Sequence, residues 1–395
     1  MTPLARGKNS IRDRTAIVGV GATPYYKRGA SLPQTLDEMI GKSIIGASAD
    51  AGLKVTDIDG FAYFAGGFDT PFLMETLGIP EVRYTATLTG SGGGSAGAIE
   101  LAASAVVAGL AEVVVCVGAV QQNTLRYGAM PTSYAATPES AFYKAAGLVG
   151  PGHMFALLAR RHMHLYGATR AQFAEVAMST RLNAMNHPAA LIRKPLTAED
   201  YFAAPLIADP HCLYDFCLET DGAIAVIVTS AERARDLRQP PVYVLAGAHG
   251  GTRQWGRSIY WMNMPERDFA SSGHVPIAQR LYDMAGVGPR DIDVAQIYDH
   301  FTSQVIMELE DYGFCEKGEG GPFVESGAIR FDGGSIPVNT DGGQLSGGYV
   351  WGMTHVREAV EQLRGTAVNQ VKDASLALVT GGPSSIPVSG LILRR

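Results

Sequence analysis

A chain of 395 residues with 46% hydrophobic and 18% charged residues is typical of a folded globular protein, and its length favours two domains or one large duplicated body. The formal net charge of −6 argues against a nucleic-acid partner, because phosphate binding needs a basic surface, and no apolar run is long enough to span a bilayer. Only four cysteines occur, none in a CxxC pair, which predicts no metal site and a reduced, cytoplasmic protein.

Short apolar runs along the chain predict strands that are buried on both faces of a mixed sheet. The first run, TAIVGVG at 15–21, leads into VGVGATPYY, which begins like a dinucleotide-binding turn. A proline follows its two glycines and no helix opens there, which argues against NAD(P), and no P-loop pattern occurs, so no cofactor is expected. The other runs are EVVVCVG at 112–118, AIAVIVT at 223–229, PVYVLAG at 241–247 and LALVTGG at 376–382.

Two segments far apart in the chain resemble each other, which indicates an internal duplication. Residues 49–64 and 282–301 both read as a helix end, an Ala-Gly cap, an Asp-Ile-Asp turn and a strand. Gly52 and Gly286 stand where a left-handed residue is expected to end each helix.

A second pair of segments, 90–119 and 341–382, shares the order of glycine-rich turn, helix and apolar strand. The stretch between the two halves has helical pieces but no strand-like run. The sequence therefore predicts two related α/β halves, each a mixed sheet with helices on both sides, and an inserted helical lobe. The expected boundaries are 1–120 for the first half, completed by 206–245, then 121–205 for the lobe and 246–395 for the second half.

Several separated motifs, in the right order, resemble the thiolase superfamily over essentially the whole chain. They include the turn at 90–98, the tetrad Tyr298-Asp299-His300-Phe301 and NTDGGQLSGGYVWG at 339–352. The segments 159–177, 186–217 and 220–230 are similar to the lipid-transfer-protein and sterol-carrier-protein thiolase-like branch. The resemblance implies an α/β thiolase-like fold, in which two mixed-sheet halves stack in αβαβα layers and carry an inserted helical loop domain.

The four positions where the thiolase family carries reactive side chains differ in this chain. Gly92 stands where the nucleophilic cysteine is expected, Tyr298 and Tyr349 stand in place of two histidines, and Thr380 stands in place of a second cysteine. This pattern resembles the bacterial steroid side-chain-cleaving aldolases. The resemblance implies retro-aldol cleavage of a bulky β-hydroxyacyl-CoA to a ketone and a shortened acyl-CoA such as propionyl-CoA, without a covalent cysteine intermediate. It also implies a homodimer and a small zinc-ribbon/OB-fold partner protein.

A retro-aldol reaction needs an acceptor for the β-hydroxyl proton and donors that hold the enolate oxygen. Either Tyr298 or Tyr349 is expected to act as the base and the other as a donor, with His300 as a further catalytic candidate. The substrate-binding and oxyanion candidates, mostly backbone amides of the glycine turns, are Gly92, Gly93, Asn339, Gly342, Gly343, Gly348 and His355.

Two other functions remain compatible with the sequence. One is an acyl-transfer enzyme with a replaced nucleophile, which would consume free CoA. The other is a non-catalytic thiolase-like subunit, for which the loss of all four reactive positions would be natural. A non-catalytic subunit has no reason, however, to keep dense glycine turns and tyrosines at both histidine positions.

Overall fold

The computed structural model of the chain describes residues 10–64, 69–88, 92–122, 141, 144–148, 150–251, 270–382, 384 and 387–395. The strands of its first half are β1 (Thr15–Ala22), β2 (Tyr26–Lys27), β3 (Gly60–Phe64), β4 (Tyr84–Leu88), β5 (Val113–Val120) and β8 (Thr220–Ser230). The strands of its second half are β9 (Val242–Gly250), β10 (Val294–Gln296), β11 (Leu376–Gly381) and β12 (Val388–Arg394). Each apolar run of the sequence falls mainly in one of these strands.

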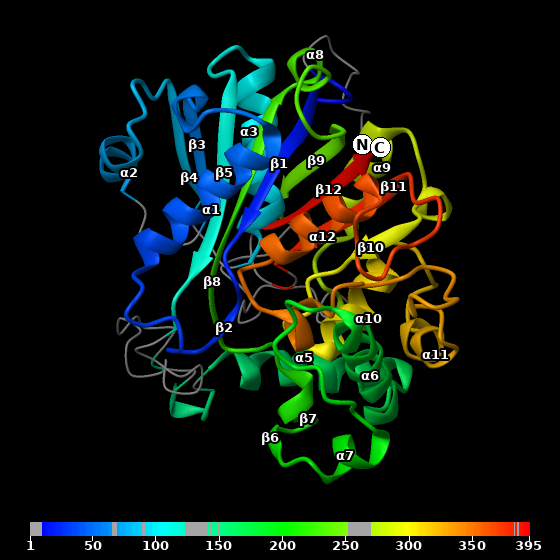
Figure 1. Ribbon diagram of the computed structural model, residues 1–395. Helices are drawn as coiled ribbons and strands as arrows, with labels where there is room; N and C mark the ends of the chain where they lie inside the picture. Colours follow the sequence, from blue (N-terminus) through cyan, green and yellow to red (C-terminus); the bar gives the residue numbers. More distant parts are fainter. Residues whose placement is uncertain are drawn as a thin grey trace.

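The strands form one continuous sheet with the order β10-β11-β12-β9-β1-β8-β5-β3-β4, and the short β2 pairs with β8 (Figure 1). The two halves join where β1 and β9 pair antiparallel, with Ala16 opposite Tyr243 and Ile17 opposite Val242. β9 also pairs along its length with β12, so it belongs to the second half.

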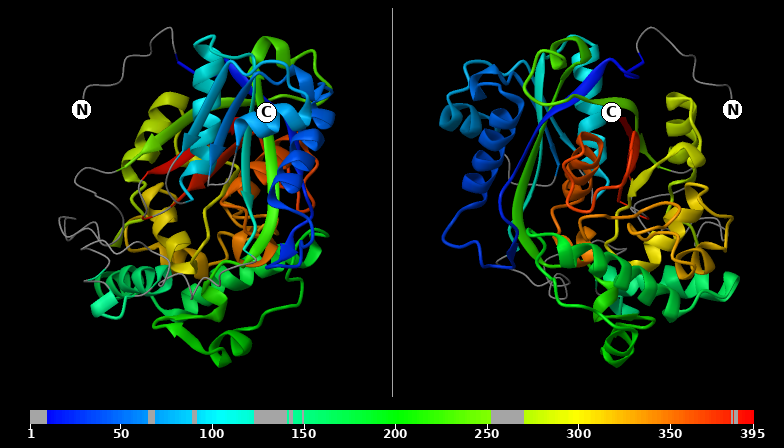
Figure 2. Two further views of the ribbon diagram at one scale, coloured as in Figure 1. Left: turned by 90° about the vertical axis from the view of Figure 1, so that its left-hand side faces the viewer. Right: turned by 45° about the vertical axis from the view of Figure 1, so that its right-hand side comes forward.

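Helices separate and cover the two half-sheets, which gives the layered arrangement seen in Figure 2. α1 (Leu36–Ala51) packs on the outer face of the first half, and α9 (Val275–Ala285) packs on the outer face of the second. α3 (Gly94–Val107) and α12 (Met353–Arg364) lie between the half-sheets and share one apolar cluster with both. The expected αβαβα order is therefore confirmed. Further helices are α2 (Thr70–Leu77), α8 (Ala231–Ala234), α10 (Thr302–Asp311) and α11 (Gly320–Glu325).

The internal duplication is visible in equivalent elements of the two halves. α1 ends at Gly52 and α9 ends at Gly286, and both glycines have a left-handed backbone, with φ of 75° and 69°. A short 3-10 turn follows each helix, at Val55–Asp57 and at Pro289–Asp291. The next strand then joins its sheet parallel to its neighbour, β3 beside β5 and β10 beside β11.

A lobe, residues 150–217, covers one end of the layered body (Figure 1). It contains α5 (Pro151–Tyr166), α6 (Arg170–Asn186), α7 (Ala198–Ala203) and the hairpin of β6 (Leu206–Ala208) and β7 (His211–Cys212). Most of the expected lobe segment before residue 150 lies outside the described residues. Within the described part of the chain, no helix combines the length and apolarity needed to cross a membrane.

Candidate active site

Tyr298 follows the short strand β10, and its backbone is held from two sides. The Asn339 side chain accepts a hydrogen bond from the Ile297 amide at 2.7 Å and donates to the Ile297 carbonyl at 2.8 Å. The Tyr298 amide donates to the Thr380 hydroxyl, at the end of β11, at 2.9 Å. The Asn339 side chain therefore holds the backbone next to Tyr298, and both the oxygen and the nitrogen of its amide group are already hydrogen-bonded to that backbone.

Tyr349 follows a π-helical turn, Gly343–Gly347, and faces Tyr298. The Tyr298 hydroxyl donates to the Tyr349 hydroxyl at 3.5 Å, and the two side chains are only 3% and 1% exposed. Burial raises the pKa of Tyr298 well above its usual value, although the hydrogen bond with Tyr349 acts in the opposite direction. The structure thus brings together the two tyrosines that the sequence singled out.

Gly92 lies directly against the ring of Tyr298. A Cβ atom built on Gly92 would lie 2.0 Å from both Cζ and Oη of Tyr298. The phenol ring therefore occupies the space into which a side chain at position 92 would project. A cysteine nucleophile at position 92 and Tyr298 in its observed place exclude each other.

The two glycines after Gly92 also make room for other segments. A Cβ atom built on Gly93 would lie 1.8 Å from the Pro387 carbonyl oxygen, and one built on Gly94 would lie 1.5 Å from the Phe64 ring. α3 begins at Gly94, so the positive end of the helix dipole lies at this turn. Among the described residues, no acceptor bonds to the amides of Gly92 and Gly93, so this turn can supply the donors of an oxyanion hole.

The second glycine turn wraps around the carboxylate of Asp299. The amides of Gln344 and Leu345 donate to this carboxylate at 2.9 Å and 3.3 Å. A Cβ atom on Gly343 would lie 2.2 Å from Asp299 Oδ2. Gly342 and Gly343 have φ of 99° and 55°, a left-handed backbone that favours glycine. The turn is therefore built to hold a carboxylate of the protein itself.

The amides of Gly342, Gly343 and Gly348 are already used within the second turn. They donate to the Asn339 carbonyl, the Asp341 carboxylate and the Gly343 carbonyl respectively. The sequence led us to expect these amides in an oxyanion hole. In the structure, a thioester oxygen would first have to displace one of these hydrogen bonds, so the first turn is the better oxyanion candidate.

His300 and His355 flank the Tyr298 ring, with ring centroids 5.2 Å and 6.1 Å away. His300 packs edge-on against Phe155, and burial lowers its pKa to about 3, so the imidazole is neutral near pH 7. His355 Nε2 lies 3.2 Å from Asp299 Oδ1, and both side chains are fully buried. His355 therefore faces the Asp299 carboxylate, whereas His300 lies beside the tyrosine pair.

All four cysteines are free thiols, and none is activated. Burial is the largest cause that raises the pKa of each, and Cys315 reaches about 12. Cys217 lies beside the site, where its amide donates to the His300 carbonyl at 3.0 Å. Because a nucleophilic cysteine needs a lowered pKa, these thiols do not support acyl transfer.

A cavity of about 830 Å³ lies between the lobe and the second half of the protein. Phe301 and Leu345, next to His300 and to the second glycine turn, form part of its largely apolar wall. Arg181 and Lys194 supply positive charge to the same wall, and the Arg181 guanidinium donates to the Ser346 hydroxyl at 2.9 Å. Asp200 and Glu219 line the same cavity, so the charge of its wall is mixed, and neither Tyr298 nor Tyr349 belongs to its lining.

One group of side chains has the composition of a metal site. Ligand atoms of His187, Glu358 and Glu361 lie within 4.8 Å of one another. Glu358 Oε1 accepts from Thr340, and Glu361 pairs with Arg357 at 2.7 Å, whereas Glu358 Oε2 has no hydrogen-bond partner among the described residues.

Sequence reasoning missed one buried carboxyl near the site. The Thr380 hydroxyl, which holds the Tyr298 amide, donates to the carboxyl of Glu308 in α10. No motif marks Glu308, and the only signal in the sequence is its place between Met307 and Leu309 in a helix that proves to be buried.

Comparisons with known proteins agree with the layered fold described above. A family model described as thiolase C-terminal domain-like matches residues 256–389. The 17-hydroxy-3-oxo-4-pregnene-20-carboxyl-CoA lyase of Mycobacterium tuberculosis is 39% identical over 392 residues, covering 97% of this chain and 100% of the relative. The steroid side-chain-cleaving aldolase of Thermomonospora curvata is 38% identical over 392 residues, covering 96% of this chain and 97% of the relative.

Among solved structures, one described as an Ltp2-ChsH2(DUF35) aldolase matches with a TM-score of 0.89 and 35% sequence identity. The match covers 98% of this chain and 98% of that chain. The likeness therefore extends over both half-sheets and the lobe.

Proposed function

Because this chain belongs to the branch of the thiolase superfamily that contains the steroid side-chain-cleaving aldolases, we propose that it cleaves a bulky β-hydroxyacyl-CoA by a retro-aldol reaction. The products are a ketone and a shortened acyl-CoA such as propionyl-CoA. The observation that carries this proposal is the Tyr298 ring, which fills the space of the missing nucleophile beside Gly92. No covalent intermediate on cysteine is needed, because the β-carbon leaves as a free ketone and not as an acyl group that has to be carried to an acceptor.

In the proposed mechanism, Tyr349 acts as a phenolate and removes the proton of the β-hydroxyl group, which makes it a neutral phenol. The O–H electron pair forms the ketone C=O as the Cα–Cβ bond breaks, and the electrons of that bond form an enolate on the thioester. Two observations support Tyr349 as the base: Tyr298 donates to its hydroxyl, and burial keeps Tyr298 protonated as the donor. The amides of Gly92 and Gly93 hold the enolate oxygen, and the proton taken up by Tyr349 returns to Cα.

The cavity beside the site suits the substrate. Its apolar wall can take a bulky ring system, and Arg181 and Lys194 can pair with the phosphates of coenzyme A. Coenzyme A is part of the substrate, and no separate cofactor is proposed.

We further propose that the working enzyme is a homodimer of this chain with a small zinc-ribbon/OB-fold partner. The similar solved structure is described as an Ltp2-ChsH2(DUF35) aldolase, which supports a small partner. Sedimentation of the chain, alone and with a candidate partner, tests the assembly, and a fully active monomer contradicts it.

The function is tested by incubating the protein with the CoA thioester for which the Mycobacterium tuberculosis relative is named. A steroid ketone and a shortened acyl-CoA, formed in equal amounts, are the expected products. Intact-protein mass during turnover is expected to show no acyl adduct. Acyl transfer that consumes free CoA would instead support an acyltransferase. Ketone formation that needs the partner and is unchanged by both Tyr298→Phe and Tyr349→Phe would support a non-catalytic subunit.

A further inference from the structure

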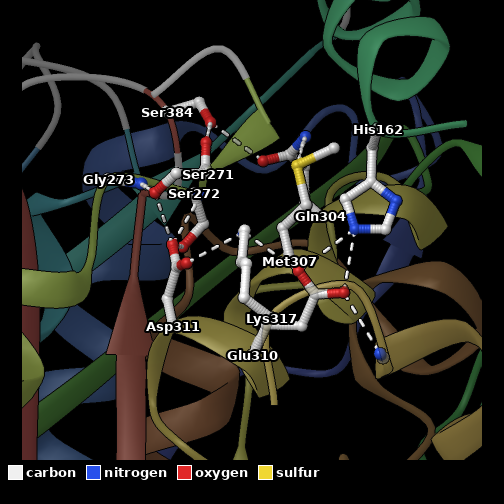
Figure 3. Close-up of polar contacts among 11 residues, drawn as sticks. His162, Ser271, Ser272, Gly273, Gln304, Met307, Glu310, Asp311, Lys317 and Ser384 are labelled. Carbon is white, nitrogen blue, oxygen red and sulfur yellow. Dashed lines mark hydrogen bonds and ion pairs between the residues drawn. The ribbon is translucent and has the colours of Figure 1, made fainter. Parts of the chain in front are cut away.

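Helix α10 carries three carboxyl groups in its last turn, and two of them have the partners that a buried carboxylate needs (Figure 3). Each of these two carboxylates, Glu310 and Asp311, has at least one basic group and several hydrogen-bond donors within reach. Glu310 is bonded by His162 at 2.8 Å, Lys317 at 2.9 Å and the Gly320 amide at 3.1 Å, and Asp311 is bonded by the hydroxyls of Ser271 and Ser272 at 2.7 Å and by Lys317 at 3.2 Å.

Glu308, in the same helix, lacks such partners. Its side chain is fully buried, and its Oε2 accepts a single hydrogen bond, from the Thr380 hydroxyl. Its Oε1 has no hydrogen-bond partner among the described residues. One imidazole nitrogen, His274 Nε2, lies 3.8 Å from Oε2, but burial lowers the pKa of His274 to about 3, so this ring is uncharged near pH 7.

A carboxylate in such a position is strongly disfavoured, because desolvation of the charge is not offset by a cation or by further donors. Burial accordingly raises the pKa of Glu308 well above its usual value, and the charges of Asp311 and Asp299 raise it further. Among the described residues, the ionisable groups that face Glu308 from the start of α9, the end of β10 and α10 itself include no cation near neutral pH: they are His274, Tyr298, Asp299, Asp311 and Tyr312.

Thr380 links this carboxyl to the tyrosine site. Its hydroxyl accepts from the Tyr298 amide at 2.9 Å and donates to Glu308, so both of its hydrogen-bonding functions are used. A negative charge on Glu308 would also oppose ionisation of the tyrosines, since it raises the pKa of Tyr298. The charge of Glu308 and the geometry of Tyr298 are therefore coupled.

We propose that Glu308 is a positioning residue that works as a neutral acid: it holds Thr380, and through it Tyr298, without placing a charge behind the tyrosine pair. The inference rests on the proposed retro-aldol function, in which Tyr349 has to be a phenolate when it takes the β-hydroxyl proton. Ionisation of Glu308 would put a second negative charge nearby, make that phenolate less stable and so slow the step.

The substitution Glu308→Gln tests this role, because an amide keeps an acceptor for Thr380 but cannot ionise. Near pH 7 we expect turnover within about threefold of the unchanged protein. At higher pH the unchanged protein is expected to lose turnover as Glu308 ionises, and the variant is expected to keep it. The matched control is Glu100→Gln in α3, a carboxyl whose pKa burial also raises and which bonds to Ser104. Its pH profile should follow that of the unchanged protein.

A second readout does not depend on activity. Glu308 keeps its proton in the folded state above the pH at which the unfolded chain loses it, near 4.3. The free energy of unfolding should therefore fall as pH rises above about 4.3, and Glu308→Gln should remove part of that fall. A constant stability difference between the two proteins from about pH 5 to 9 would overturn the neutral-acid assignment. If the unchanged protein shows no aldolase activity alone or with its small partner, the proposed function fails, while this comparison still decides the protonation of Glu308.

A second pair of variants, at Thr380, covers the case in which Glu308→Gln does not fold. Thr380→Val removes the one donor to Glu308, and Thr380→Ser keeps it. Valine also removes the acceptor of the Tyr298 amide, so we expect this variant to lose at least about tenfold in kcat with little change in KM. The serine variant should restore most of this loss. Equal turnover of the two variants contradicts the positioning role.

Discussion

Two glycine turns meet at the active site, one before α3 and one before α12, and their glycines are needed for different reasons. At the first turn, Gly92, Gly93 and Gly94 leave space for a tyrosine ring, a carbonyl oxygen and a phenylalanine ring, and none of them has a positive φ. At the second turn, Gly342 and Gly343 have left-handed backbones that aim neighbouring amides at a carboxylate.

The difference shows that similar sequence can serve opposite purposes. The amides of Gly92 and Gly93 in the first turn have no acceptor among the described residues, and other parts of the protein fill the space beside these glycines. In the second turn the amides of Gln344 and Leu345 donate to Asp299, and the Tyr349 amide that follows donates to the Thr220 hydroxyl at 3.1 Å. Substitutions that add a side chain should therefore mainly lower turnover at the first turn and mainly lower the free energy of unfolding at the second.

The largest effect is expected from Gly92→Cys, which restores the nucleophile of the family. The new side chain would overlap the Tyr298 ring, so we expect turnover to fall by about a thousandfold, as for loss of a catalytic proton donor. Steady-state assays of the aldolase reaction measure this loss. Gly41→Ala in α1, where the nearest atom to a new Cβ is 3.9 Å away, is the control and should be fully active. Undiminished activity of Gly92→Cys would contradict the overlap.

Removal of the two tyrosine hydroxyl groups tests the chemistry of the site while both glycine turns stay unchanged. Tyr298→Phe and Tyr349→Phe should each lower turnover by at least about a hundredfold. Melting temperature and binding of the CoA ester should barely change, because phenylalanine keeps the packing. Tyr63→Phe, a buried tyrosine of β3 that bonds to Thr70, is the matched control. A variant that keeps more than about a third of the turnover would show that its tyrosine is neither base nor donor.

A smaller effect on activity, and a larger one on stability, is expected from Gly343→Ala. The added Cβ meets Asp299 Oδ2 at 2.2 Å and must keep a φ of 55°, so we expect a loss of about 1–3 kcal/mol in the free energy of unfolding. Gly365→Ala separates steric overlap from backbone strain, because Gly365 has a φ of 75° but no atom lies within 4 Å of the new Cβ. Chemical denaturation should show the greater loss at Gly343. An equal loss in both variants would mean that backbone strain alone is responsible.

The smallest effect is expected at His300, which lies beside the tyrosines without joining either turn. Burial lowers its pKa to about 3 in the folded state, against about 6.5 in the unfolded chain. The unfolded chain therefore binds more protons between these values, and stability should fall as pH drops below 6.5 toward 3. His300→Gln should reduce this fall, and the exposed control His164→Gln should not. Thermal unfolding across this range measures the difference, and identical slopes for all three proteins would contradict it.

The fold was open to prediction because its signals are local. Gly52 and Gly286 mark equivalent helix ends, and strands buried on both faces read as apolar runs. The tyrosine pair was also accessible, because both residues lie in motifs of known order. The contact between Gly92 and Tyr298 was not, because it joins residues about 200 positions apart and depends on which way a ring points. Nor does the sequence show that the amides of the second turn are occupied by Asp299.

The overlap between position 92 and Tyr298 also constrains how such an enzyme can arise from a cysteine-dependent ancestor. A cysteine at position 92 leaves no room for this tyrosine, so the tyrosine cannot be added while the nucleophile is still present. The cysteine side chain has to be lost first, or in the same event, and a lineage that has lost it has given up thioester exchange. A single substitution therefore does not convert one chemistry into the other. The cysteine has to be replaced before, or together with, the gain of the tyrosine, and glycine at position 92 is the residue that makes room for the ring.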